Sequence, residues 1–218
     1  MSKPARDETM AYSKTMLRRG ALALLALFAV LTFYVWSNPV NAFDVAFTKD
    51  VQARAWLEPL ESTNALAKTP VFRLIYLILA IAFILAKRYM ISALVVASLA
   101  SEIVTSAIKG LVGRPRPTPD VAVLLDRSPG YSYVSGHTLE YTLLFGMLAL
   151  LALRADRPRL VRYIFAGTFF TLPLIIGMGR IYAGAHWLTD VIGSFLLAGT
   201  TILVIVSASS KLPSSLKR

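Results

Sequence analysis

The sequence predicts an all-α, polytopic membrane protein with six transmembrane helices. Two observations support this fold class. The 218 residues are 56% hydrophobic and 16% charged, with a mean hydropathy of +0.62, which is a low charge content for a soluble domain. The apolar residues also gather into separate runs, each near the roughly 17 to 25 residues that a helix needs to cross a hydrocarbon core.

Each apolar run is a predicted span. The runs are Leu17 to Trp36, Val71 to Ala86, Met90 to Val112, Thr138 to Leu153, Val161 to Met178 and Trp187 to Ser207. Together they form one transmembrane domain, 17–210, between polar tails at 1–16 and 211–218. The first run also resembles a cleavable signal peptide, because small residues follow it, but its length favours an uncleaved span.

The net charge is +11, and the positions of the basic residues indicate how the chain is oriented in the membrane and do not favour nucleic-acid binding. Fourteen of the 23 basic residues lie before or at the start of the first span, in alternate links, or after the last span: Lys3, Arg6, Lys14, Arg18, Arg19, Lys87, Arg88, Arg154, Arg157, Arg159, Arg162, Lys211, Lys217 and Arg218. The positive-inside rule makes this side cytoplasmic, so both termini are predicted to be cytoplasmic. The absence of cysteine excludes disulfides and leaves the redox compartment open.

Residues 40–69 form the longest outer connection. Apolar residues are mixed there with acids such as Asp44 and Asp50, which fits a short amphipathic helix at the interface or a plain connector. Neither interpretation gives this segment a part in the chemistry.

Polar residues enter the outer half of the third span. Glu102, Ser106 and Lys109 share one helix face at spacings of four and three. A charge at mid-membrane depth costs about 2.5 to 3.5 kcal/mol on insertion scales, so another group must compensate for Glu102. Glu140 is a second such carboxylate. It either orients an arginine or a histidine or closes a polar network, and we favour the network.

A proline-rich loop follows Lys109 and carries Arg114 and Arg116. Prolines restrict the backbone, so the loop is expected to present both arginines in a preset geometry. Guanidinium forks and a lysine charge suit a phosphate dianion. Taken alone, the same cluster also fits contact with lipid headgroups.

Ser135, Gly136 and His137 open the fourth span. Gly136 permits close backbone approach to an anion at a helix N-terminus, Ser135 offers a hydroxyl and His137 a proton. The alternative is that Ser135 only caps the helix and His137 is an interfacial residue.

His186 and Asp190 stand four residues apart at a predicted helix start, so the carboxylate can hold the imidazole. Arg180 precedes them, where the fifth span meets the outer loop. Alone, the pair fits an activated histidine, half of a metal site or a polar helix contact. The chain has only two histidines, and we expect both rings to face one pocket with Arg116 and Arg180.

The three pieces resemble the motifs of the type 2 phosphatidic acid phosphatase superfamily. Its pattern is lysine, six residues, Arg-Pro; then Pro-Ser-Gly-His; then Ser-Arg, five residues, His, three residues, Asp. This chain keeps the spacing with Lys109 and Arg116-Pro117, with Ser135-Gly136-His137, and with Arg180, His186 and Asp190. It departs from the pattern at Val134, where the family has proline, and at Gly179, where the family has serine.

The resemblance implies a metal-independent lipid phosphatase that needs no cofactor. His186 would be the nucleophile, Asp190 would orient it, and His137 would protonate the leaving group, through a phosphohistidine. Substrate binding is assigned to Lys109, Arg116, Arg180, Ser135 and Gly136. A metal phosphatase is the less favoured alternative, since few acids lie near the histidines in sequence.

The expected substrate is a lipid phosphate or diphosphate of the undecaprenyl pyrophosphate, phosphatidic acid or phosphatidylglycerol phosphate type. The resemblance places the protein in a bacterial inner membrane with its site on the extracytoplasmic face. The alternatives are a lipid-to-lipid phosphotransferase, for example one that modifies lipid A, a phosphatase for soluble substrates, and a non-catalytic lipid-binding protein. The sequence determines neither the lipid nor the oligomeric state.

Overall fold

The computed structural model describes residues 3–62 and 70–208, and every regular element in these ranges is helical. The elements are α1 (Lys3–Ser37), α2 (Ala42–Gln52), the 3-10 helix η1 (Ala55–Ser62), α4 (Pro70–Leu85), α5 (Tyr89–Val112), α6 (Gly136–Arg154), α7 (Arg159–Tyr182) and α8 (Leu188–Ala208). The predicted all-α class is confirmed. The predicted C-terminal tail, 211–218, lies outside the described residues.

Five helices are long and apolar enough to cross a membrane: Lys14–Ser37 within α1, and the whole of α5, α6, α7 and α8. They match five of the six predicted spans. The second predicted span corresponds to α4, whose 16 residues extend about 24 Å at 1.5 Å per residue. That is less than the roughly 30 Å of a hydrocarbon core, so its length alone does not establish a sixth crossing.

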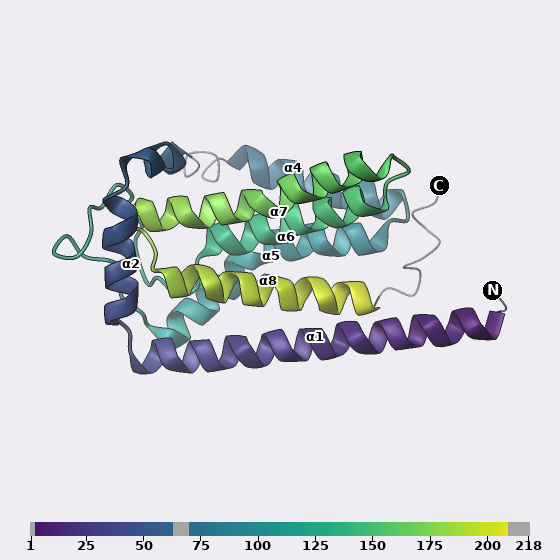
Figure 1. The fold of residues 1–218 in the computed structure, drawn as a ribbon, viewed down its shortest axis with the longest axis horizontal. Helices are drawn as coiled ribbons and strands as arrows, with labels where there is room; N and C mark the ends of the chain where they lie inside the picture. Colours follow the sequence, from purple (N-terminus) through teal and green to yellow (C-terminus); the bar gives the residue numbers. More distant parts are fainter. Residues whose placement is uncertain (1–2, 63–69, 209–218) are drawn as a thin grey trace.

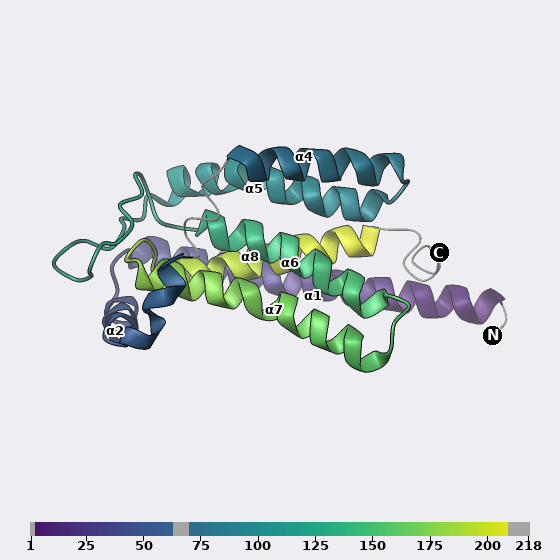
Figure 2. The ribbon, with the colours of Figure 1, turned by 90° about the horizontal axis from the view of Figure 1, so that it is seen from above.

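The central helix of the bundle is α6, which contacts α5, α7 and α8. On one side α1 runs along α8, and on another α4 runs along α5 (Figures 1 and 2). Glycines permit the closest approaches. A Cβ on Gly199 would meet Leu24 Cδ1 at 2.9 Å, and one on Gly193 would meet the Tyr133 hydroxyl at 2.8 Å. Small residues at helix contacts are typical of membrane bundles.

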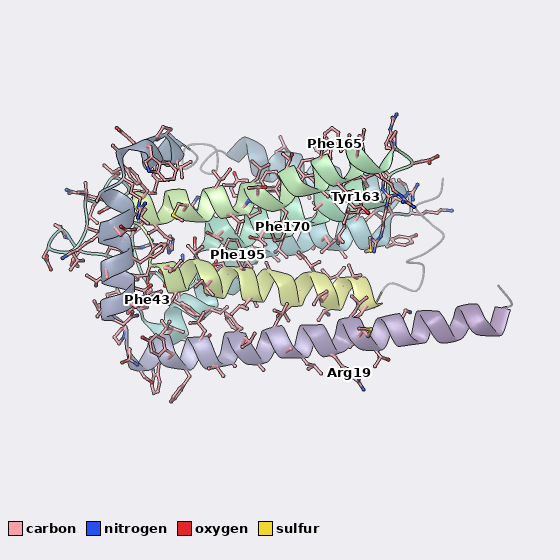
Figure 3. All side chains as sticks on the ribbon, viewed as in Figure 1. Arg19, Phe43, Tyr163, Phe165, Phe170 and Phe195 are labelled. Carbon is pink, nitrogen blue, oxygen red and sulfur yellow. The ribbon has the colours of Figure 1, made fainter. Side chains whose placement is uncertain are left out.

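The long sides of the bundle are apolar. Tyr163, Phe165 and Phe170 project from α7 (Figure 3) and are 62%, 53% and 71% exposed. Large contiguous apolar surfaces are rare on soluble monomers, whereas lipid tails cover them without penalty. This surface agrees with the membrane assignment from composition.

One end of the bundle, called the site end below, holds α2 and the loop of residues 113–135 (Figure 1). The helix α2 lies across this end and begins at an N-cap, where the Asn41 side chain accepts the Asp44 backbone N–H at 2.9 Å. Val51 and Leu57 of α2 and η1 pack on Ile181 of α7. At the opposite end α1 begins, α8 ends, and short links join α4 to α5 and α6 to α7 (Figure 1).

Candidate active site

Two left-handed glycines shape the loops of the site. Gly113, at φ 66°, ends α5, and its N–H bonds to the Lys109 carbonyl at 2.9 Å before the chain turns into the arginine loop. Gly184 has the same φ in the link between α7 and α8, and a Cβ there would lie 2.3 Å from the Val123 carbonyl oxygen. The second turn is therefore packed directly against the loop of residues 113–135.

His186 lies at the end of this link and is 1% exposed. Its Nδ1 is 3.3 Å from Asp190 Oδ2, and the same oxygen accepts the Trp187 backbone N–H at 2.9 Å. The histidine contact is slightly long for a hydrogen bond, as is common at catalytic groups before substrate binds. The carboxylate favours the tautomer with its proton on Nδ1, which leaves the Nε2 lone pair available. The predicted pairing of His186 with Asp190 is present.

A cavity of about 250 Å³ opens beside His186. The predicted residues that line it are Lys109, Arg116, Gly136, His137, Arg180 and His186. The prediction that both histidines share a pocket with Arg116 and Arg180 is therefore confirmed. Glu102 and Glu140 line the same cavity, so the two membrane-depth acids share one polar space with its cations.

The surroundings of His186 keep its imidazole neutral. Burial lowers the pKa of His186 well below its usual value, and repulsion from Arg180, Arg116, Lys109 and His137 lowers it further. A neutral ring at physiological pH can act as a nucleophile.

Backbone carbonyls hold Arg116 at the cavity. Its Nη1 donates to the Ala185 carbonyl at 2.7 Å, and its Nε donates to the Gly130 carbonyl at 3.1 Å. The same Nη1 is 3.3 Å from His186 Nε2. Burial, followed by repulsion from Arg180, lowers the pKa of Arg116, but an arginine stays charged at physiological pH. Neutral carbonyls fix the guanidinium without cancelling its charge, which suits it to meet an anion.

Arg180 lines the cavity and also pairs with a carboxylate that sequence reasoning did not assign to it. Its Nη1 donates to Asp126 Oδ2 at 2.7 Å. The backbone N–H groups of Leu125 and Asp126 donate to the Ala183 carbonyl at 3.0 and 3.1 Å. The loop of residues 113–135 is thereby fastened to the end of α7.

Ser135 is buried and does not line the cavity. Its hydroxyl oxygen accepts a hydrogen bond from the Thr138 hydroxyl at 3.0 Å, and its carbonyl accepts one from the Ser194 hydroxyl at 2.9 Å. The contact with Ser194 joins the start of α6 to α8. A contact of Ser135 with phosphate stays a prediction, whereas its neighbours Gly136 and His137 do face the cavity.

Arg114 faces away from the cavity, which corrects the expectation that the loop presents both arginines to phosphate. Its side chain is 0% exposed. Its Nη1 donates to Asp190 Oδ1 at 2.5 Å and to Thr189 Oγ1 at 2.7 Å, and its Nη2 donates to Asp44 Oδ2 at 2.6 Å. The guanidinium also lies 5.6 Å from the centre of the Trp187 ring. Arg114 forms ion pairs with two buried carboxylates, Asp44 and Asp190, and it therefore stabilises the charge of Asp190.

Asp44 of α2 completes this buried cluster, which corrects the prediction that residues 40–69 have no part in the site. Its Oδ2 accepts from Arg114, from the Thr189 hydroxyl at 2.6 Å and from Asn41 Nδ2 at 2.7 Å. Its Oδ1 accepts the Thr189 backbone N–H at 3.0 Å. The sequence signal was only an acid in a short predicted helix, and its partner Arg114 is 70 residues away.

Across the described residues, no three histidine or acidic side chains gather closely enough to hold a metal ion. Independence from metal stays a prediction.

Comparisons with known proteins find relatives in sequence and in fold. A family model described as the PAP2 superfamily matches residues 89–213. Phosphatidylglycerophosphatase B of Bacillus subtilis (strain 168) is 25% identical over 184 residues, which cover 81% of this chain and 88% of that protein. The crystal structure of a transmembrane PAP2-type phosphatidylglycerolphosphate phosphatase from Bacillus subtilis has a TM-score of 0.67 at 20% identity and covers 85% of this chain and 93% of its own. This last likeness concerns the fold.

Proposed function

Because the chain belongs to the PAP2 superfamily and is thereby a phosphatase, we propose that it is a metal-independent membrane lipid phosphatase that works through a phosphohistidine. One observation carries the proposal. The Nδ1 of His186 contacts Asp190, and its Nε2 lies beside Arg116. His186 also lines a cavity whose other lining residues include Lys109, Arg116 and Arg180.

In the first step, His186 Nε2 attacks phosphorus and the bond to the leaving oxygen breaks. Asp190 stabilises the positive charge that the imidazole acquires, and His137 donates a proton to the leaving alkoxide or phosphate. Lys109, Arg116, Arg180 and the Gly136 N–H hold the equatorial oxygens.

In the second step, water attacks the phosphorus of the phosphohistidine and the N–P bond breaks. His137, now deprotonated, takes a proton from this water, and inorganic phosphate leaves. A lipid acceptor in place of water would make the protein a phosphotransferase, so the identity of the product distinguishes the two reactions.

The position of α4 supports a substrate that arrives from the bilayer. Ser92 of α5 donates to the Ala80 carbonyl of α4 at 3.0 Å, and these helices run in opposite directions. The described part of α4 begins at Pro70, and the start of this helix lies short of the site end (Figures 1 and 2). Glu102 and Ser106 lie on the part of α5 beyond it and are exposed. A lipid headgroup can reach the cavity through this side.

The B. subtilis relative, by its name, makes phosphatidylglycerol phosphate the first lipid to test. Phosphatidic acid and undecaprenyl pyrophosphate complete the panel. The test is phosphate release from each lipid in mixed micelles by wild type, His186→Ala and His137→Ala, with and without EDTA. We expect release by wild type in EDTA, none by His186→Ala and slow release by His137→Ala. Equal rates in the three proteins would exclude this site, and recovery only with Mg²⁺ would exclude the metal-independent mechanism.

We also propose six crossings, with both termini cytoplasmic and the site end outside a bacterial inner membrane. The start of α1 and the end of α8 lie at one end of the bundle, which requires an even number of crossings, and α4 supplies the sixth (Figure 1). Since the chain has no cysteine, single replacements report position cleanly. A membrane-impermeant maleimide is expected to label Asp120→Cys in intact cells and Asp156→Cys only after permeabilisation. The reverse pattern would invert the orientation.

A further inference from the structure

We propose that Asp44 is a positioning residue of the phosphatase reaction, because it neutralises Arg114 and so leaves the negative charge of Asp190 available to His186. The inference rests on the proposed function. It adds to the reaction a residue of α2, which lies outside the residues matched by the family model.

The hydrogen bonds at Asp44 identify it as an ionised carboxylate. Its two oxygens accept from four donors: Asn41 Nδ2, Arg114 Nη2, the Thr189 hydroxyl and the Thr189 backbone N–H. The side chain is 0% exposed and does not line the cavity. A carboxylate whose two oxygens accept only from donors has no acceptor to which a proton on it could be donated. Asp44 therefore acts on the site through its charge and not through substrate.

The charges of the buried cluster favour a cation at His186. Arg114 carries +1 and lies between Asp44 and Asp190, which carry −1 each, so the cluster has a net charge of −1. Without Asp44, the charge of Arg114 would cancel that of Asp190, and the net charge would be zero. The imidazole becomes positive when Nε2 bonds phosphorus, while Arg116, Arg180 and Lys109 repel that charge from the cavity. The surplus negative charge opposes this repulsion.

A structural role is the competing explanation, since Asp44 also fastens α2 to the start of α8 through Thr189. The two explanations differ in one combination of variants. Asp44→Asn brings the cluster to zero charge, whereas Asp44→Asn with Arg114→Gln returns it to −1. If charge is what matters, the second substitution restores activity that the first removed. If fastening matters, the two losses combine as independent effects.

The experiment measures kcat and KM for phosphate release from phosphatidylglycerol phosphate in mixed micelles, with phosphatidic acid as the second substrate. Asp44→Asn is expected to lower kcat by about 10- to 100-fold, the size of loss seen when a partner that orients a metal-binding histidine is removed. KM is expected to stay within about twofold, because Asp44 does not line the cavity. Asp50→Asn is the matched control on α2, since Asp50 is exposed and pairs with the exposed Arg54; it should behave as wild type.

The double variant decides the outcome. A kcat above that of Asp44→Asn alone supports the proposal, as does a double variant that folds and works when Asp44→Asn alone does not fold. A wild-type kcat in Asp44→Asn overturns it. A double variant whose kcat is at or below that of Asp44→Asn also overturns it, and so does a double variant that unfolds together with Asp44→Asn. Failure of the proposed function looks different: wild type would release no phosphate, or His186→Ala would still release it.

Discussion

Arg114 and Arg116 lie two residues apart on one proline-rich loop but belong to two different regions of the molecule. Arg114 is in the buried cluster with Asp44 and Asp190, where carboxylates meet its charge. Arg116 is in the cavity wall, where carbonyls hold it and its Nη1 is 3.3 Å from His186 Nε2.

The contrast shows that the partners of an arginine determine whether its charge stabilises the protein or can bind a ligand. A guanidinium between two buried carboxylates is committed to the protein, and removal of either partner leaves a buried charge unpaired. A guanidinium fixed by neutral carbonyls keeps its charge for a ligand. Substitutions in the two regions are therefore expected to have different consequences for stability and activity.

The largest effect is expected from Arg114→Ala. It leaves Asp44 and Asp190 buried together without their shared cation, a loss that costs roughly 3–5 kcal/mol when one partner of a buried ion pair is removed. The melting temperature in detergent should fall strongly, and activity should disappear with it. An unchanged melting temperature would contradict the structural role of the buried cluster.

Arg116→Ala is expected to lower kcat/KM by about 10²- to 10³-fold, the usual result of removing one group that stabilises transition-state charge. Its bonds to the Gly130 and Pro129 carbonyls are exposed, so water can replace the guanidinium there and the melting temperature should change little. Kinetics and thermal unfolding of one preparation test both statements. A variant that loses stability as Arg114→Ala does would remove the distinction between the two arginines.

A smaller effect is expected on the pH dependence of kcat/KM, which Arg116→Ala should shift. Since burial and the cavity cations lower the pKa of His186 below its usual 6.5, the ring becomes protonated, and inactive as a nucleophile, only below that pH. The acid limb of kcat/KM should therefore lie below pH 6.5 in wild type. Arg116→Ala removes one repelling cation and should move this limb to higher pH. A limb that stays in place would show that Arg116 does not act on the charge of His186.

The smallest effect is expected from the exposed ion pair of Asp50 and Arg54 on α2, whose side chains are 58% and 51% exposed. Solvent-exposed pairs contribute about 0–1 kcal/mol. Asp50→Asn should shift the melting temperature only slightly, and a loss as large as that of Arg114→Ala would mean that exposure does not separate the two kinds of ion pair.

Sequence reasoning recovered the parts of the site that follow from spacing. A separation of four residues at a helix start brings His186 to Asp190, and glycine with histidine at the mouth of α6 brings His137 to the cavity. Sequence reasoning did not recover the pairing of Asp126 with Arg180. The two residues are 54 apart, and no local sequence pattern predicts the partner of an acidic residue in a loop.

By itself, the sequence determined the helical class, the positions of five spans and the motifs that line the cavity, because hydrophobic runs and local spacings act within one helix or one loop. Only the tertiary structure decided that Arg114 turns inward while Arg116 turns to the cavity. The deciding partner, Asp44, lies on α2, across the site end of the bundle. Which arginine is buried depends on where carboxylates from distant segments meet, and that is a property of packing that no local pattern encodes.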